Sequence, residues 1–578
     1  MELTQAQHLM WLGQKLHPQA PLYNMVFEFR IWAELDVDLF RKAFATLLQA
    51  SDNLRTIIRE VAGEPQQIVL DTLDFQVPFI DFSNEANPDA VYTEWLDKKR
   101  AELFRLDERL FDCALVKLND DATIWFWSQH HIATDVGTCM VLYNTMSDLY
   151  KQAISGQPIT APHLPAYVEY VADEQSARQT DTWQHSADYW TKELERNTEP
   201  VQFYAGDTGA TSTHTTRVTV PITQDQHKRL RELAYLPGIR SFSRDLTDAN
   251  LFTALIWAYL YRLTANDVIR LGVTLGNRST PQHQQTMGML LEVLSVTGEF
   301  DADDNLFTLV KKAAAANLRT IQHLQPGMSS AAHNRAYDVL LNFITGRFSD
   351  FAGISTDVSW VHSDYGDDSH KLRIQVHDLN DTGHYTVAFD FNTAAFSELE
   401  RQYAIDHFLK VAAACLTHPE QPVRSISLLT NEEQQQFVHA FNATEVDYPS
   451  SETVVDLFEQ QAASTPDAIA LRLDEKSLTY AELNNAANTL AKHVIEAGIQ
   501  PGQTVPIFVD HSFEMVIAVL GVLKAGAAYV PLDTAYPAER IRQLLGNLGE
   551  VPLIVTQSKY ANVLADYSTL TIEHAELS

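Results

Sequence analysis

The chain has 578 residues, of which 45% are hydrophobic and 20% are charged, and its formal net charge is −33 at pH 7. A chain of this length is too long for one hydrophobic core and predicts roughly three or four compact units, with a composition typical of a globular protein. The surplus of negative charge excludes nucleic acids and anionic membranes as partners, because both would repel the protein.

Cysteine usage and the N-terminal sequence bear on location and on metal binding. The three cysteines, Cys113, Cys139 and Cys415, lie far apart and show no spacing typical of a metal site or a disulfide framework. The first residues lack the basic and apolar segments of a signal peptide, and the longest apolar run, residues 515–523, is too short to cross a bilayer. We therefore expect a cytoplasmic protein that binds neither a metal ion nor a membrane.

The beginning of the chain predicts alternating helices and strands. Hydrophobic residues recur at helical spacing in residues 3–17 and 36–50, and residues 23–32 alternate as a strand does. Trp11 lies on the apolar face of the first of these helices. Arg55 follows the second helix, where an isolated arginine is most often a solvated surface charge.

Two adjacent histidines stand where a strand is predicted to end and a helix to begin. Residues 122–129 are rich in β-branched and aromatic residues, which predicts a buried strand, and residues 138–151 carry apolar residues at helical spacing. His130 and His131 lie between these segments, and Asp135 follows four residues after His131. Because a rigid strand and helix aim the side chains at such a junction, this is a candidate site for chemistry.

The middle of the chain predicts a second set of strands and helices, which begins near residue 208. Residues 268–276 form a predicted buried strand that ends in Gly276-Asn277-Arg278, and residues 339–343 form another that carries Asn342 within an apolar run. A buried asparagine must find hydrogen-bond partners or cost about 1–3 kcal/mol. Neither half shows regular βαβ alternation, so each half indicates a mixed α/β (α+β) lobe.

The histidine stretch resembles the HHxxxDG signature of condensation domains from nonribosomal peptide synthetases. One position departs from it, because Val136 stands where the family has glycine and Gly137 follows. The resemblance implies that His131, His130 and Asp135 are the catalytic residues. It also implies that Gly137 supports the site and that Val136 lines the substrate tunnel, where its added bulk is expected to narrow the tunnel or shift His131.

Further motifs extend the resemblance. Trp11 belongs to a stretch that resembles the first core motif of the family, and Arg55 to a Leu-Arg-Thr that resembles the end of the second. Gly288 is the well-matched residue of a divergent GxFVNT motif, and Asn342 falls where the family often has Phe-Asn-Tyr. The resemblance therefore places Trp11, Gly288 and Asn342 along the tunnel. It also suggests that Arg55 supports the site by pairing with Asp135.

The resemblance implies the roles of the three signature residues. We expect His131 first to hydrogen-bond and orient the nucleophile and second to accept its proton. We expect His130 to support the turn. Asp135 is interpreted as structural, through its pairing with Arg55, and not as a relay of charge to His131.

The resemblance also implies the fold. Condensation domains consist of two chloramphenicol-acetyltransferase-like lobes that form a V-shaped pseudo-dimer, with a tunnel between the lobes and the histidines at its midpoint. We expect the following domains: an N-lobe at residues 1–175, a C-lobe at 176–430, a polar linker at 431–452 and a partial adenylation domain at 453–578.

The C-terminal part resembles a second family. Residues 478–483 and 523–533 are similar to the first two core motifs of adenylation domains, in the N-terminal subdomain of an acyl-CoA-synthetase-like fold. The sequence ends at Ser578, before the glycine-rich phosphate loop of such enzymes. We expect this truncated part not to use ATP and Mg²⁺, which only a full adenylation domain would use. It predicts an amino-acid-loading module with downstream adenylation and thiolation domains.

The function that the resemblance implies is amide-bond formation between a donor acyl thioester and the amine of an acceptor aminoacyl thioester. Both substrates would arrive on the 4'-phosphopantetheine arms of peptidyl or acyl carrier proteins, with no cofactor bound directly. The first motif begins almost at Met1, which suggests either a starter type that takes an acyl group such as a fatty acid from a stand-alone carrier, or a trimmed N-terminus.

Two alternatives stay open at this point: an ester-forming domain with a hydroxyl acceptor, and a catalytically silent recruitment module. Epimerisation domains share the signature but normally precede a condensation domain, and heterocyclisation domains carry a DxxxxD pattern that is absent here. Donor and acceptor identity, stereochemical subtype and oligomeric state do not follow from the sequence.

Overall fold

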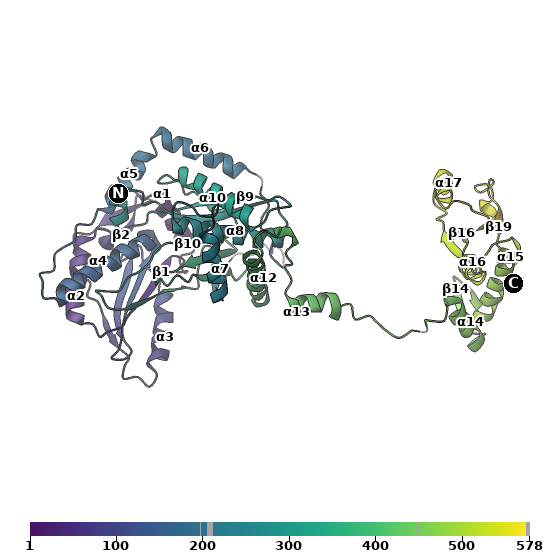
Figure 1. Ribbon diagram of the computed structural model, residues 1–578, viewed down its shortest axis with the longest axis horizontal. Coiled ribbons are helices and arrows are strands. Elements are labelled where there is room, and N and C mark those ends of the chain that lie inside the picture. The colour runs from purple at the N-terminus through teal and green to yellow at the C-terminus, as the bar shows by residue number, and fades with distance from the viewer. Residues whose placement is uncertain (197, 205–211, 449, 574–578) are drawn as a thin grey trace. The chain divides into compact units, whose positions relative to one another are not determined.

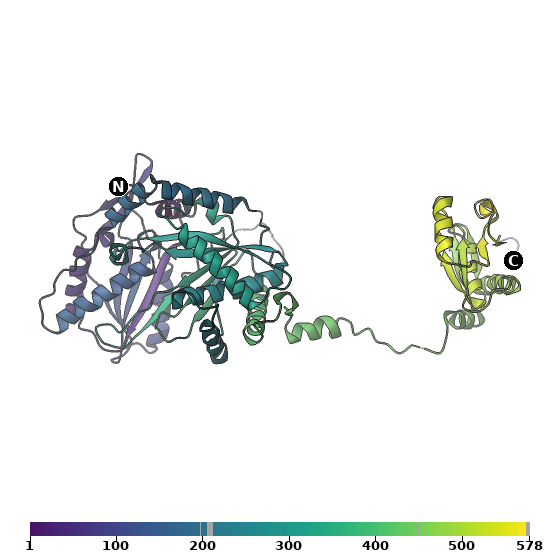
Figure 2. The ribbon, with the colours of Figure 1, turned by 45° about the horizontal axis from the view of Figure 1, so that its top comes forward.

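The computed structural model describes residues 1–196, 198–204, 212–448 and 450–573 and divides into two compact units, residues 1–440 and 441–578 (Figure 1). The first unit contains two lobes, each built on one sheet with helices packed against it (Figure 2). Within the described residues, no helix is both long and apolar enough to cross a bilayer. Nor do the described side chains include a group of three or more histidines, cysteines and carboxylates placed to hold a metal ion.

The first lobe is built on a five-stranded sheet in the order β11-β1-β6-β5-β4. Its strands are β1 (Asn24–Ile31), β4 (Phe79–Asp81), β5 (Phe111–Lys117), β6 (Thr123–His130) and β11 (Thr356–Val361). A separate hairpin joins β2 (Thr56–Val61) and β3 (Glu64–Val69). The helices of this part are α1 (Gln5–Leu16), α2 (Val37–Ala50), α3 (Pro88–Arg100), α4 (Val136–Ile154), α5 (Tyr167–Ala177) and α6 (Asp181–Glu195).

Aromatic residues of β6 explain why this strand is central to the first lobe. Trp125 and Trp127 are fully buried against α2 and α4, where they pack with Phe40 and Phe44. Phe126 points to the opposite face of the sheet and packs against Trp95 of α3. Because successive residues of a strand face opposite sides, a run of large apolar residues requires a sheet covered on both faces.

The second lobe is built on a six-stranded mixed sheet in the order β7-β13-β12-β10-β8-β9. Its strands are β7 (Thr215–Val220), β8 (Val268–Gly276), β9 (Leu291–Glu299), β10 (Val339–Ile344), β12 (Leu372–His377) and β13 (Thr386–Asn392). The apolar core lies between this sheet and helices α8, α10 and α12. The helices are α7 (Gln224–Ala234), α8 (Arg244–Thr264), α9 (Pro281–Gln285), α10 (Leu306–Gln322), α11 (Ala331–Asn334), α12 (Glu398–Thr417) and α13 (Asn431–Gln434).

One strand ties the two lobes together. Strand β11 follows β10 of the second lobe in sequence, yet it pairs antiparallel with β1 of the first lobe, with Val26 opposite Val361. The sequence did not predict this pairing. Residues 431–440, placed in the linker by the sequence, are helical and belong to the first unit. The predicted start of the second lobe near residue 208 lies outside the described residues.

The second unit has its own core and sheet. A parallel sheet in the order β17-β16-β18-β19 contains β16 (Thr504–Phe508), β17 (Ala528–Pro531), β18 (Ile554–Thr556) and β19 (Thr569–Thr571). A hairpin joins β14 (Ile469–Leu473) and β15 (Lys476–Thr479). The helices are α14 (Val454–Ser464), α15 (Tyr480–Glu496), α16 (Phe513–Lys524) and α17 (Ala538–Asn547), of which α15 and α16 pack together over the apolar core.

Candidate active site

The turn from β6 to α4 positions the candidate catalytic residues. Every residue of β6 is buried, which holds the strand rigidly, and the strand ends at His130. A single 3₁₀ turn over His131–Ala133 follows. Asp135 then caps the N-terminus of α4 by accepting a hydrogen bond from the backbone N–H of Thr138 at 2.7 Å. The predicted strand-turn-helix arrangement around the two histidines is therefore confirmed.

The side chain of His130 is enclosed by protein. It is 1% exposed, its Nδ1 accepts a hydrogen bond from the backbone N–H of Ile132 at 3.1 Å, and its ring meets Tyr23 and Phe104 edge-on. Burial, with a smaller contribution from His131, lowers the pKa of His130 to about 3. The His130 imidazole is thus held by a hydrogen bond within the turn, and its supporting role stays a prediction.

His131 stands where two cavities meet. Cavity A, of about 300 Å³, is lined by α1, by residues 329–335 and by β11 and β12. Cavity B, of about 520 Å³, is lined by α4, by the end of β10 and by the segment around Arg278. Six residues line both cavities: Met25, His131, Thr274, Leu291, Asn342 and Trp360. The two cavities therefore adjoin, and His131 lies in the lining that they share.

The environment of His131 favours a neutral imidazole. The backbone N–H of His131 donates to the carbonyl of Tyr23 at 2.7 Å, and Nδ1 of the ring is buried. Burial lowers the pKa of His131, an effect that Asp135 and the carbonyl groups of His131 and Thr134 oppose and the charge of Arg373 reinforces. With Nδ1 turned into the protein, Nε2 is the nitrogen that is left to meet a substrate.

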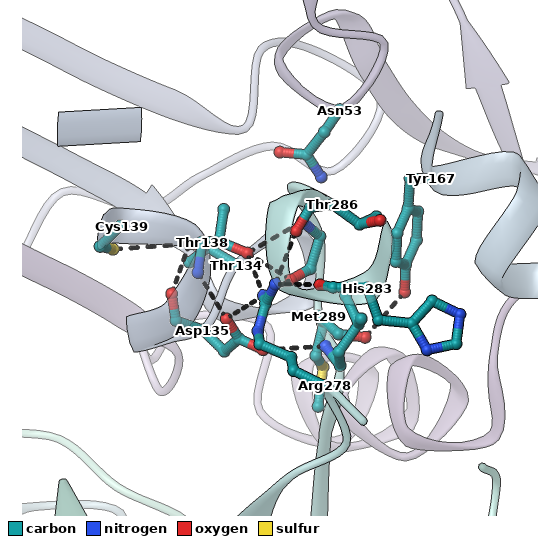
Figure 3. A network of polar contacts seen from close by, with 12 residues as sticks. Asn53, Thr134, Asp135, Thr138, Cys139, Tyr167, Arg278, His283, Thr286 and Met289 are labelled. Atoms are coloured by element: carbon teal, nitrogen blue, oxygen red, sulfur yellow. Dashed lines mark hydrogen bonds and ion pairs between the residues drawn. The ribbon is translucent and has the colours of Figure 1, made fainter. Parts of the chain in front are cut away.

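Asp135 is the centre of a polar network that links the two lobes (Figure 3). Its carboxylate accepts hydrogen bonds from Arg278 Nη2 at 2.6 Å and from the backbone N–H of Leu290 at 2.9 Å, in addition to that of Thr138. Burial raises the pKa of Asp135. Arg278 and the two backbone N–H groups together lower it by more than burial raises it, so the pKa of Asp135 lies below the usual range. Asp135 is thus held as a carboxylate between α4, Arg278 and the backbone of Leu290.

The predicted pairing of Arg55 with Asp135 is wrong. Arg55 donates from Nη1 to the backbone carbonyls of Leu70 and Asp71, and so holds the segment after β3. The partner of Asp135 is Arg278, which also donates to the carbonyls of His283 and Thr286, as Figure 3 shows. The signal that could have identified Arg278 was its position directly after the predicted strand at residues 268–276.

The glycine at position 137 has a clear steric reason. A Cβ atom on Gly137 would collide with the guanidinium group of Arg278, so only glycine lets this arginine reach Asp135. Val136 is the first residue of α4, and its φ is not positive, so the backbone needs no glycine there. The Val136 side chain lines cavity B, where a Cβ on Gly346 would lie 2.6 Å from its Cγ1. Gly137 therefore leaves the space that Arg278 occupies, and Val136 lines cavity B.

The structure separates the other three residues expected along the tunnel. Asn342 lines both cavities and accepts a hydrogen bond from Thr274 Oγ1 at 2.6 Å. Trp11 and Gly288 are absent from the lining of cavities A and B, and their place along the tunnel stays a prediction. Trp11 packs in an apolar cluster beside the histidine turn, because it lies on the face of α1 that points away from cavity A. Gly288 is buried with φ +152°, where a side chain would collide with the ring of Tyr167.

Comparison with known families decides the identity of the first unit. The family model described as "Condensation domain" matches residues 1–438. The chain belongs to the condensation-domain family. Downstream of this condensation domain, residues 458–576 match part of the family described as "AMP-binding enzyme". The resemblances inferred from the histidine signature and from the C-terminal motifs are both confirmed.

The curated relatives are large synthetases. The chain is 24% identical to surfactin synthase subunit 1 and 26% identical to a dimodular nonribosomal peptide synthase, both of Bacillus subtilis (strain 168). These matches cover 99% and 98% of this chain but 16% and 24% of those proteins. The chain therefore spans less than a quarter of the length of these relatives.

Solved structures show the same fold at low sequence identity. A mutant starter condensation domain of rhizomide synthetase, in complex with C8-CoA and Leu-SNAC, has a TM-score of 0.65 and 19% identity over 74% of this chain and 97% of that one. A four-domain nonribosomal peptide synthetase bound to AMP and glycine has a TM-score of 0.75 and 16% identity over 100% of this chain and 45% of that one. A condensation domain followed by part of an adenylation domain is therefore the fold of this chain.

Proposed function

We propose that the condensation domain joins a carrier-bound acyl thioester to the amine of a carrier-bound aminoacyl thioester. The observation that carries this proposal is the position of His131, which lines both cavities at the point where they meet. Two acyl groups on 4'-phosphopantetheine arms could enter from the two parts of the passage and meet at this ring. The partners are then a donor and an acceptor carrier protein, with adenylation and thiolation domains of the same cytoplasmic assembly.

The reaction depends more on positioning the amine against the thioester carbonyl than on strong acid–base catalysis. A free α-amine has a pKa of about 7.7–8.0, so a useful fraction is neutral near pH 7. Its nitrogen attacks the thioester carbonyl carbon, the C–S bond breaks, and the departing thiolate takes up the proton that the amine loses. Holding the two groups in near-attack geometry can supply roughly 7–11 kcal/mol.

His131 is suited to orient the amine and to carry its proton. Because its pKa is lowered by burial, the ring is neutral at pH 7 and Nε2 can accept a hydrogen bond from the amine. A positioned general base adds about 10²–10⁴-fold to a rate. Asp135 does not take part in this transfer, because its carboxylate is fully engaged by Arg278 and by two backbone N–H groups.

The lining of cavity B favours an aliphatic donor. Val136, Met140, Phe343 and Ile344 line it, and its one arginine, Arg278, is held by Asp135. The similar rhizomide synthetase domain is described as a starter domain with C8-CoA bound. We therefore propose a starter type of condensation, with a medium-chain acyl donor in cavity B and the aminoacyl acceptor in cavity A.

The proposal is tested by mass spectrometry of the products formed from a panel of donor thioesters and aminoacyl or hydroxyacyl acceptors. We expect an N-acyl amide with an aliphatic donor and an aminoacyl acceptor. Product only with hydroxyacyl acceptors would show an ester-forming domain. Absence of any product from carriers that are proven to be loaded would indicate a silent recruitment module.

A further inference from the structure

One face of the second sheet turns polar groups toward the passage. Along β12, Leu372, Ile374 and Val376 point into the apolar core, as the alternation of a strand requires. Arg373 and Gln375 point the other way and line cavity A. The wall of cavity A therefore carries polar groups that come from a rigid element, close to the histidine turn.

His370, which lies just before β12, has unused hydrogen-bonding capacity. It is 5% exposed, lines cavity A and stacks on the ring of Tyr337, with centroids 5.0 Å apart and planes parallel within 1°. Within the described part of the chain, neither ring nitrogen has a hydrogen-bond partner of ordinary geometry. Burial lowers the pKa of His370, and the nearby backbone of Asn334 opposes this effect. Because buried polar groups in folded proteins are almost always satisfied, this pair of nitrogens calls for a ligand.

The guanidinium group of Arg373 has hydrogen-bond donors that meet no acceptor among the described residues. Within the described ranges, no carboxylate lies within ion-pair distance of it, and its Nη2 donates a hydrogen bond to the backbone carbonyl of Asp367 at 3.0 Å. Arg217, in the same wall, is by contrast closed by Asp390, with distances of 2.6 and 2.9 Å. Gly366 leaves room for the Arg373 guanidinium, which a Cβ atom there would displace.

The carboxylate of Asp367, the residue whose backbone carbonyl accepts from Arg373, is already engaged. Asp367 accepts hydrogen bonds from the backbone N–H of Ser369 at 2.9 Å and from its hydroxyl at 2.5 Å, and a longer one from Asn334 Nδ2 at 3.4 Å. The charge of the Asp367 carboxylate acts on Arg373 from a distance, and the two side chains make no hydrogen bond to each other. The donors of Arg373 are therefore left for a group that enters cavity A.

We propose that His370 and Arg373 form a subsite in cavity A that binds the side chain of an acceptor aminoacyl group carrying a carboxylate or carboxamide oxygen. The inference rests on the proposed function and names the substrate class of one of its two cavities. A guanidinium group presents paired donors that match such oxygens, and an imidazole N–H supplies another. Arg373 and His131 both line cavity A, so one aminoacyl group in this cavity could reach both residues.

Cavity B offers no such subsite, which makes the assignment specific. Its charged lining residues are Asp135 and Arg278, which are paired with each other, and Asp148. A carboxylate would gain no free cation there and would lose its hydration. The subsite therefore recognises a polar side chain of the acceptor and not of the donor.

Calorimetry on the full chain tests the subsite. The probes are the aspartyl, asparaginyl and leucyl amides of pantetheine, which keep the α-amine but cannot transfer. We expect the aspartyl and asparaginyl probes to bind about 10-fold or more tighter than the leucyl probe. Arg373→Met should remove this preference. His370→Phe, which keeps the stacking on Tyr337, should reduce it, and the control Arg240→Met, at an exposed position outside both cavities, should preserve it.

Two outcomes would overturn the subsite: equal affinity for the three probes, or a preference that survives in Arg373→Met. The same acceptors, offered as thioesters with an octanoyl donor, give a separate readout of the proposed function. Binding preference without any product would refute amide formation and leave the subsite standing. Product formation with no side-chain preference in binding or turnover would refute the subsite alone.

Discussion

Two of the arginines that line cavities A and B, Arg278 and Arg373, have different surroundings. Arg278 donates to Asp135, to the hydroxyl of Thr138 and to the carbonyls of His283 and Thr286, so both of its terminal nitrogens are bonded to protein. Arg373 has one main-chain partner among the described residues and faces cavity A. The difference shows that an enclosed, fully bonded cation holds the lobes in place, whereas a cation with donors facing a cavity is available to a substrate.

Loss of the carboxylate at Asp135 would remove the ion-pair partner of Arg278. Asp135→Ala leaves Arg278 buried without its partner, and breaking a buried ion pair in this way costs about 3–5 kcal/mol. We expect a lower melting temperature and lower condensation activity together, measured by thermal unfolding and product formation. A variant that is as stable as the wild type but inactive would point to direct chemistry by Asp135.

A smaller effect is expected where glycine gives Arg278 its space. Gly137→Ala places a methyl group against the guanidinium, and overpacking of this kind costs typically about 1–3 kcal/mol. The matched control is Gly546→Ala, where the added methyl group meets nothing within 4 Å. Chemical denaturation compares the two variants. Equal unfolding free energies would show that Arg278 can move away freely, against the rigid network described here.

Buried histidines, among them His370 in cavity A, make the stability of the condensation domain sensitive to acid. Burial lowers the pKa of His130 to about 3 and those of His362, His370 and His377 to about 4, below an unfolded value of about 6.5. The unfolded chain therefore binds more protons between these values, and stability falls as pH drops below about 6.5. Each group contributes about 1.4 kcal/mol per pH unit within its window.

One variant isolates a single contribution to this acid sensitivity. His370→Phe should flatten the dependence of the unfolding free energy on pH between about 6.5 and 4, because it removes one protonatable ring. Denaturant unfolding of the variant and the wild type at several pH values measures the slope. An unchanged slope would mean that His370 meets solvent or a partner that keeps it protonated, and it would weaken the case for an unfilled subsite.

The smallest expected change concerns Val136. Val136→Gly introduces glycine at the start of α4, at a cost of about 0.5–1 kcal/mol, and enlarges cavity B. We expect a shift of donor preference toward longer acyl chains with little change among acceptors. Competition between octanoyl and dodecanoyl donors measures this. A shift in acceptor preference instead would contradict the assignment of the two cavities.

Local features of the site could be predicted from the sequence. The run of aromatic and β-branched residues at 123–127 predicts β6, and the turn after His131 follows from the strand and helix on either side of it. His130 and Asp135 are both buried at this turn, and the roles expected for them from the motif stay predictions. These features depend on neighbours within a few positions, where periodicity and propensity are informative.

Contacts between distant segments could not be predicted. Arg278 meets Asp135 across 143 residues, and Arg55, at a matched motif position, turns to the carbonyls of Leu70 and Asp71. Strand β11 leaves the second lobe to pair with β1, which no local pattern indicates. The vacant hydrogen-bonding groups of His370 and Arg373 likewise appear only when the packing around them is known.

The central claim is that His131 orients the attacking amine where the cavities meet. The most direct measurement is the single-turnover rate of amide formation by His131→Ala, with an octanoyl-loaded donor carrier and an aminoacyl-loaded acceptor carrier. We predict an unchanged melting temperature and a rate about 10²–10⁴-fold below that of the wild type. A rate equal to that of the wild type would contradict the claim.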